Sequence, residues 1–276
     1  MNERIGFMQG RLVPMVDGKI QCFPWATWHQ EFQRASVNGF TLMEWTLDQD
    51  RLRENPLMTA AGRGEIANLR QQFWLRIPSL TGDCFMQAPF WKTEGAIYHR
   101  LLDDAAAVAD ACLELDIGLI IVPLVDNGSI ENASQADVLR QGLDWVLAPR
   151  PGIQVLFESD FAHKRLATFI ASFPAASYGI NYDIGNSAAL GYFPADELAS
   201  YHMRIANVHV KDRRRGGITV PLGTGDADLA GAILGLEQRG YRGNYILQTA
   251  RALDGDDAGA ACRYRDMTAA WIRGEA

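Results

Sequence analysis

The sequence is poor in cysteine, in positive charge and in long apolar runs, and each shortage argues against a class of protein. Its four cysteines are scattered without a Cys-x-x-Cys pair, which argues against a zinc ribbon and a disulfide framework. A net charge of −7 argues against a surface that binds nucleic-acid phosphates. No stretch approaches the ~20 apolar residues of a membrane span, and the N-terminus lacks the apolar segment of a signal peptide. We therefore expect a soluble cytoplasmic protein with no nucleic-acid or membrane partner.

Short β-rich apolar runs are plentiful, and each is followed by a longer stretch with helical spacing. This alternation is typical of parallel strands covered by helices. The runs number eight, which is the number of strands that closes a (β/α)8 barrel. With no linker, repeat or break in composition, we predict a single α/β domain, a TIM barrel, over residues 1–276. Its strands are expected at Ile5–Met8, Thr41–Trp45, Arg76–Leu80, Gly118–Leu124, Gln154–Phe157, Ile180–Asp183, Ala206–Val210 and Tyr245–Gln248.

The segments between these runs carry helix signals. Glu94–Leu115 is rich in alanine and leucine with a single glycine, which favours a helix. Pro194 is placed to open a helix over Ala195–Met203, and Asp226 is placed to cap another. Arg213–Arg215, followed by two glycines, is expected to be a loop. A doubly wound nucleotide-binding sheet is disfavoured because no Gly-x-Gly-x-x-Gly motif follows the first strand.

Polar side chains close several predicted strands, at the end where a TIM barrel carries its active site. Glu158 ends the fifth strand, Asp183 the sixth, His209 the seventh and Gln248 the eighth. Strand alternation allows all four side chains to point into the barrel. Three carboxylate or amide oxygens and one imidazole nitrogen suit Mn²⁺, Mg²⁺ or Co²⁺, with Zn²⁺ as a further candidate. We therefore predict a site for one divalent metal ion.

These endings, together with GFMQGRL near the N-terminus and NVHVKD followed by LGTGDAD, resemble those of the xylose isomerase-like TIM barrels. The resemblance covers essentially the whole chain and points to the sugar phosphate isomerase and epimerase group. It implies a metal-dependent isomerase or epimerase acting on a small sugar, sugar phosphate or sugar acid. It also implies a homodimer, and it assigns the metal to Glu158, Asp183, His209 and Gln248.

Gln248 departs from the ketose 3-epimerases of this group, in which the first and last of these positions are both glutamates. An amide oxygen can still coordinate a metal, but an amide is no base near neutral pH. Glu158 alone could remove a proton next to a carbonyl and return it to the neighbouring carbon through an enediolate, which is an aldose–ketose isomerisation. Lys211 and Glu44 are the candidates for a second proton carrier, with a phosphate contact or a hydrogen bond as their alternatives.

Several residues just beyond strand ends are candidate substrate ligands. The resemblance places Arg215 at a position that contacts substrate in the epimerase branch, and the cationic members of the set favour an anionic substrate. Plainer interpretations are a solvated loop charge for Arg215 and an Asx turn for Asn186. The full set is Asn186, Arg215, Arg11, Arg251 and Lys164.

Two other functions stay open on the same scaffold. A dehydratase of a keto-polyol or keto acid would remove the same proton and expel a β-hydroxyl group. A non-catalytic sugar-binding barrel would have lost the chemistry, and Gln248 is the residue that keeps this alternative. The endonuclease branch is disfavoured because its multi-zinc site needs many histidines, and the chain has five.

Overall fold

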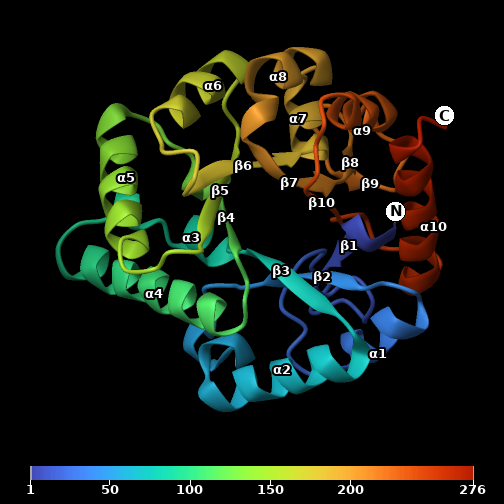
Figure 1. Ribbon diagram of the computed structural model, residues 1–276, viewed down its shortest axis with the longest axis horizontal. Helices are drawn as coiled ribbons and strands as arrows, with labels where there is room; N and C mark the ends of the chain where they lie inside the picture. Colours follow the sequence, from blue (N-terminus) through green and yellow to red (C-terminus); the bar gives the residue numbers. More distant parts are fainter. Residues whose placement is uncertain (1, 276) are drawn as a thin grey trace.

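Eight parallel strands form a closed barrel in the computed structural model, which describes residues 2–275 (Figure 1). Neighbours along the chain pair with one another, and β1 pairs with β10 to close the ring. The predicted TIM barrel is therefore confirmed. Both ends of each predicted strand lie within two residues of the ends of an observed strand. The barrel strands are β1 (Ile5–Met8), β2 (Leu42–Thr46), β3 (Arg76–Thr81), β4 (Leu119–Leu124), β5 (Gln154–Ser159), β6 (Tyr178–Asp183), β7 (Ile205–Val210) and β10 (Asn244–Leu247).

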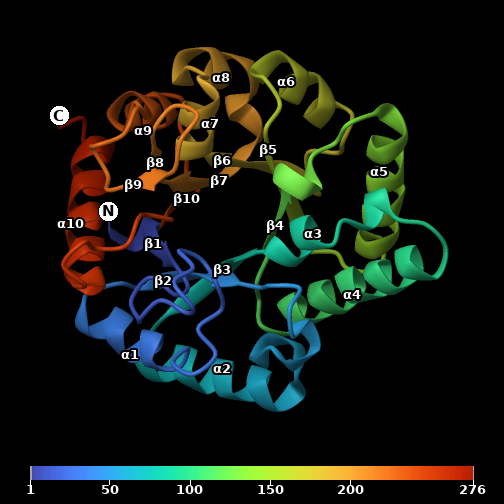
Figure 2. The same cartoon turned by 180° about the vertical axis from the view of Figure 1, so that it is seen from behind.

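Helices surround the barrel on all sides (Figures 1 and 2). Two short helices, α3 (Asp83–Gln87) and α7 (Ile184–Leu190), begin directly after β3 and β6 at the mouth of the barrel. The outer helices are α1 (Gln30–Val37), α2 (Ala60–Phe73), α4 (Gly95–Glu114), α5 (Ala133–Leu147), α6 (His163–Ala171), α8 (Pro194–Tyr201), α9 (Leu229–Gln238) and α10 (Asp257–Ile272).

The predicted helices are confirmed, with one corrected helix cap and one corrected loop. The stretch expected at 94–115 is α4, and Pro194 opens α8 as its first residue. The cap of α9 is Asp228 rather than Asp226, because the Asp228 carboxylate accepts the Gly231 N–H at 2.9 Å. The expected loop at 213–215 instead begins with Arg213 in a short strand, β8 (Asp212–Arg213), which pairs antiparallel with β9 (Thr219–Val220).

Asp212 explains why the sequence LGTGDAD follows the VHVKD strand. Its buried carboxylate accepts backbone N–H groups from Gly223 at 2.9 Å, Gly225 at 2.8 Å and Ala227 at 3.2 Å. A Cβ atom at Gly225 would lie 2.0 Å from the Asp212 carboxylate, so only glycine fits there. The motif therefore fastens the loop after β7 at the mouth of the barrel.

The two faces of the strands line different environments, as alternation predicts. Outward side chains such as Val155, Phe157 and Val208 belong to the large apolar core between strands and helices. Inside the barrel, a small separate apolar cluster consists of Met8, Leu42 and Ile246. Other inward side chains are polar, and they form the site described below.

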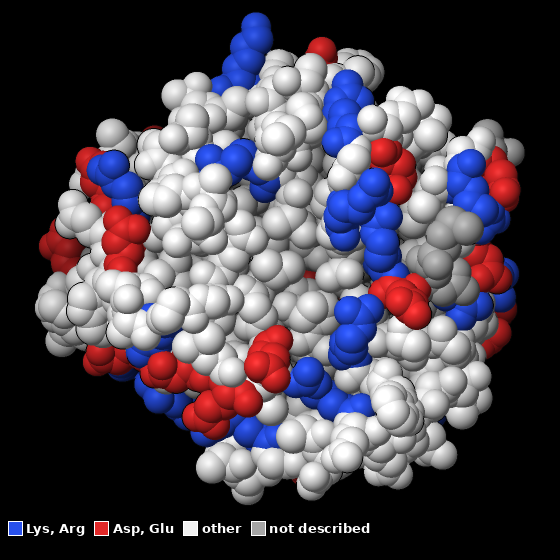
Figure 3. All heavy atoms as spheres, viewed as in Figure 1, with Lys and Arg blue, Asp and Glu red and all other residues white. Residues whose placement is uncertain are grey.

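The surface charges, the lengths of the helices and the state of the cysteines bear on the expectations from composition. On the face shown in Figure 3, acidic and basic side chains lie next to one another around a largely uncharged central area. Within residues 2–275, no helix has the length and apolar character needed to cross a membrane. All four cysteines are free thiols. The cytoplasmic location and the homodimer stay predictions.

Candidate active site

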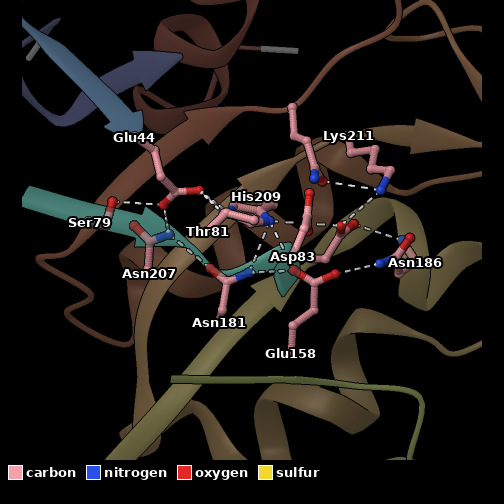
Figure 4. A network of polar contacts seen from close by, with 12 residues as sticks. Glu44, Ser79, Thr81, Asp83, Glu158, Asn181, Asn186, Asn207, His209 and Lys211 are labelled. Atoms are coloured by element: carbon pink, nitrogen blue, oxygen red, sulfur yellow. Dashed lines mark hydrogen bonds and ion pairs between the residues drawn. The ribbon is translucent and has the colours of Figure 1, made fainter. Parts of the chain in front are cut away.

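The carboxyl ends of three neighbouring strands bring Glu158, Asp183 and His209 together inside the barrel. Figure 4 shows Glu158 and His209 among their polar neighbours. All three side chains are buried, and one ligand atom from each lies within 4.8 Å of the others. His209 Nδ1 lies 3.0 Å from Glu158 Oε2 and 3.9 Å from Asp183 Oδ2. Asp183 also caps α7, since its other carboxylate oxygen accepts the Asn186 N–H at 2.8 Å. Two carboxylates and one imidazole nitrogen therefore converge, and this group could hold a divalent metal ion.

The other ring nitrogen of His209 is held by Glu44 of β2, with Nε2 2.7 Å from Oε1. The same carboxylate accepts hydrogen bonds from Ser79 Oγ at 2.7 Å, Thr81 Oγ1 at 2.6 Å and Asn207 Nδ2 at 3.0 Å. A carboxylate surrounded by donors is an acceptor, so His209 Nε2 carries a hydrogen. Nδ1 is therefore the nitrogen that would give up its proton to bind a metal, in the carboxylate–histidine arrangement that is common around metal sites.

Glu44 needs a correction, because the sequence suggested it as a second proton carrier. The residue is 0% exposed, and its two oxygens are taken up by four protein donors. Glu44 is not among the residues that line the cleft described below. It therefore orients His209 rather than meeting a substrate.

Charges within the cluster compensate one another. Burial alone would lower the pKa of His209, but the carboxylates of Glu44 and Glu158 outweigh it and raise that pKa to about 10. Burial alone would raise the pKa of Glu158, but hydrogen bonding to His209, together with Lys211, holds it below the usual range. Burial raises the pKa of Asp183, and Lys211 offsets part of that effect. Glu158 is thus ionised at neutral pH and able to accept a proton.

Gln248 follows β10 directly and uses both ends of its amide. Its Oε1 accepts a hydrogen bond from Lys211 Nζ at 3.1 Å, and Lys211 Nζ also donates to Asp183 Oδ2 at 3.2 Å. Its Nε2 donates to Gln21 Oε1 at 2.8 Å, which turns Oε1 toward the carboxylates. The strand thus ends on a neutral side chain whose oxygen faces a cation.

Asn186 and Asn181 fix the two oxygens of Glu158. Asn186 Nδ2 donates to Glu158 Oε1 at 2.7 Å, and Asn181 Nδ2 donates to Glu158 Oε2 at 2.8 Å. Arg213 Nη1 in turn donates to Asn186 Oδ1 at 2.8 Å. The side chain of Asn186 therefore reaches toward the candidate base instead of closing a local turn.

A cleft of about 580 Å³ opens over these residues at the mouth of the barrel. Four residues that the sequence suggested line it: Glu158, Asn186, Lys211 and Gln248. Sequence reasoning missed other polar lining residues, although the aspartates among them follow strand ends within two residues and the strand-end rule could have found them. The missed residues are Gln21, Asp48, Thr81, Asp83, Gln87, Asp126, Asp160 and Arg213.

Asp83 differs from the other missed aspartates in its ionisation. Burial raises the pKa of Asp83 to about 7, with Asp48 and Glu158 adding to the shift. Gln21 Nε2 donates to its Oδ2 at 2.5 Å, and this links Asp83 through Gln21 to Gln248. Asp83 belongs to the group of side chains gathered in Figure 4. An acid that changes charge near neutral pH therefore faces the same cleft as Glu158.

Arg11 and Arg251 lie outside the cleft, which corrects their expected role as substrate ligands. Arg11 is 4% exposed and donates to the backbone oxygens of Thr249 at 3.0 Å and Ile20 at 2.7 Å. Arg251 donates to the Val13 oxygen at 2.8 Å and pairs with a carboxylate at 3.1 Å. Both guanidinium groups fasten the long loop after β1, which is a role that no local spacing reveals.

Arg215 and Lys164 also lie away from the cleft. Arg215 lines a separate pocket of about 340 Å³ between α7, α8 and the β8–β9 hairpin, together with Phe193 and Asp226. Lys164 is exposed on α6 and lines neither of these two pockets. Of the three arginines at the β8 hairpin, Arg213 rather than Arg214 or Arg215 lines the cleft.

A family model described as xylose isomerase-like TIM barrel matches residues 32–266. The chain belongs to this family. A curated relative, L-ribulose-5-phosphate 3-epimerase UlaE of Escherichia coli (strain K12), is 23% identical over 258 residues and covers 89% of both chains. A xylose isomerase domain protein from Alicyclobacillus acidocaldarius has a TM-score of 0.73 at 17% identity, covering 98% of this chain and 99% of its own. A structure of the IOLI protein with a bound zinc atom has a TM-score of 0.71 at 15% identity, covering 98% of both.

Proposed function

We propose that this member of the xylose isomerase-like family is a divalent-metal-dependent isomerase or epimerase of a small sugar. The observation that carries the proposal is the convergence of Glu158, Asp183 and His209, with Nδ1 of His209 turned toward the two carboxylates, next to a cleft that Glu158 lines. The name of the relative UlaE, an epimerase of a ketose phosphate, supports the same class of reaction.

The donor set fits a divalent ion. Glu158, Asp183 and His209 supply two carboxylates and one imidazole nitrogen, and the Gln248 amide oxygen is the fourth candidate ligand. Lys211 Nζ lies within 3.2 Å of two of these oxygens, so they already face a positive charge. A bound ion would polarise a substrate carbonyl and favour the negative charge that develops on its oxygen. Oxygen-rich sets of this kind favour Mn²⁺, Mg²⁺ or Co²⁺, and the zinc in the IOLI structure supports a divalent ion in general.

Glu158 is the proposed base. Its carboxylate is ionised and held by two amides, so it can take a proton from the carbon next to a carbonyl group. Return of that proton to the neighbouring carbon, together with transfer of the hydroxyl proton from one enediolate oxygen to the other, completes an isomerisation without a second base at carbon. Epimerisation needs a proton from the opposite face, and Gln248 has none to exchange. Lys211 and Asp83 are the two proton-bearing groups of the cleft that could supply it.

Asp83 also supports the alternative function of a dehydratase. Elimination of a β-hydroxyl group needs an acid that protonates the leaving oxygen, and a carboxyl group with a pKa near 7 is suited to that role. The products separate the two reactions, because only elimination loses water and creates a conjugated enone that absorbs ultraviolet light.

Metal content and proton exchange together test the proposal. We expect about one Mn²⁺ per chain in the wild-type protein and loss of that ion in Glu158→Gln and His209→Ala. The Mn²⁺-loaded wild type should exchange a carbon-bound hydrogen of D-allulose or D-tagatose with D₂O, as followed by NMR. Glu65→Gln on the exposed face of α2 is the matched control and should keep both properties. Exchange that persists in Glu158→Gln would contradict the proposal.

A further inference from the structure

We infer that the substrate is an uncharged ketose rather than a sugar phosphate or a sugar acid. This inference rests on the proposed function and concerns the charge of the same cleft. Two cations line the cleft, Lys211 and Arg213. They face five carboxylates, which belong to Asp48, Asp83, Asp126, Asp160 and Glu158.

Each of the three guanidinium nitrogens of Arg213 already donates one hydrogen bond. Its Nε and Nη2 donate to the Gly217 carbonyl oxygen at 3.1 and 2.7 Å, and its Nη1 donates to Asn186 Oδ1 at 2.8 Å. Bidentate binding of a phosphate or carboxylate needs two parallel N–H donors on one edge of the guanidinium group. Binding at the edge formed by Nε and Nη2 would break the hairpin contact with Gly217, which leaves one N–H on each Nη atom for a ligand.

Lys211 is engaged as well, through Asp183 and Gln248. Both partners belong to the proposed metal site, so the ammonium group lies at the floor of the cleft beside the reacting carbons. In a ketose 5-phosphate or 6-phosphate, the phosphate is attached at the far end of the sugar, away from those carbons. The ammonium group is therefore in the wrong part of the cleft to bind it.

The rim of the cleft, where that far end would lie, carries aspartates without counter-ions. Among ion pairs within residues 2–275, none involves Asp48, Asp83, Asp126 or Asp160. Asp48 accepts only neutral donors, the Phe23 N–H at 3.0 Å and the Gln87 amide at 2.9 Å. A divalent ion would balance Glu158 and Asp183 but not Asp48, Asp126 and Asp160, so a phosphate dianion would be repelled.

Hydroxyl groups suit the same surface. Carboxylate side chains accept hydrogen bonds from hydroxyl groups, and amide side chains both accept and donate them, without needing a charged partner. Asp83, Gln21 and Gln87 line the cleft. Apolar side chains, including Met86 and Leu190, line the remaining wall and suit the carbon-bound hydrogens of a sugar. The cleft therefore has the chemistry of a neutral polyol site.

The test compares D-allulose and D-tagatose with their 6-phosphates on the Mn²⁺-loaded wild-type protein. Hydrogen exchange in D₂O reports turnover, and isothermal calorimetry reports binding whether or not turnover occurs. We expect the neutral sugars to bind at least ~10-fold more tightly and to be the ones that exchange. Tighter binding of the 6-phosphates, with or without exchange, overturns the inference. Binding of the neutral sugars without any exchange supports the inference and counts against the proposed function, whereas binding of neither class overturns both.

A charge-removal variant sharpens the test. Asp126→Asn/Asp160→Asn removes two rim charges and should reduce the preference for neutral sugars by about fivefold, through the affinity of the 6-phosphates. Asp103→Asn on the exposed face of α4 changes the net charge away from the cleft and should leave the preference unchanged. An equal change in both proteins would show that the rim aspartates do not set the selectivity.

Discussion

The inner wall of the site and its rim are built in opposite ways. On the inner wall, Glu44, His209 and Asn207 are 0% exposed, and Glu44 alone accepts four hydrogen bonds. At the rim, Asp83 is partly exposed and has one side-chain donor, and Asp126 is exposed. A buried, satisfied network holds its groups in one geometry, whereas an exposed charge can adapt to a ligand. We propose that the wall fixes the chemistry and the rim selects the substrate.

Glu44→Gln should have the largest effect, because it breaks the wall at its most connected residue. The new NH2 group would meet either His209 Nε2–H or the Asn207 amide donor to donor, and His209 would lose its anionic partner. We expect metal affinity to fall by about 10- to 100-fold. We also expect stability to fall by about 3 kcal/mol, because a buried charge pair loses one member. Metal titration and denaturant unfolding measure the two effects.

The control for this variant is Glu65→Gln, which makes the same chemical change at an exposed position of α2. It should leave metal affinity and stability unchanged. If Glu44→Gln binds Mn²⁺ as tightly as the wild type, then Glu44 does not orient His209, and the distinction between wall and rim fails.

The strands and the strand endings were predictable, because local patterns set them. Alternating apolar runs identified all eight barrel strands, and their final polar residues identified Glu158, Asp183 and His209. Asp83 follows β3 in the same way and could have been included.

Contacts across the barrel were not predictable from one sequence. The partner of His209 is Glu44, which lies 165 positions earlier and meets it only because the ring closes. The sequence suggests Arg11 as an anion ligand. Instead, its guanidinium group donates a hydrogen bond to the backbone oxygen of Thr249, near the other end of the chain. Such pairings depend on tertiary structure, and local spacing carries no record of them.

Asp83→Asn should have an intermediate effect that depends on pH. The carboxyl has an unfolded-state pKa near 3.8 and a folded-state pKa of about 7, so the folded protein holds this proton more tightly. Ionisation of Asp83 therefore removes stability as pH rises through that interval, and asparagine avoids the loss. The melting temperature of the variant relative to wild type should rise between about pH 4 and pH 7. If Asp83 also transfers a proton, kcat/KM of the wild type should change with pH near pH 7, and this change should disappear in the variant.

Asp103→Asn is the matched control for Asp83→Asn, since Asp103 is exposed on α4. Its melting temperature relative to wild type should not change over the same pH range. An Asp83→Asn variant that keeps the same pH profile of kcat/KM would remove Asp83 from the proton-transfer chemistry. It would leave Lys211 as the proton-bearing candidate for a second carrier.

Asp126→Asn should have the smallest effect on folding. Asp126 is exposed and has a φ of 49°, a left-handed conformation that asparagine also tolerates. We expect a stability change within ~0.5 kcal/mol of zero. The double variant Glu44→Gln/Asp126→Asn should then equal the sum of the single variants within ~0.5 kcal/mol, because no contact links the two residues. A larger coupling energy in denaturant unfolding would show that rim and wall act as one unit, and a change at the rim would then alter the chemistry as well as the selectivity.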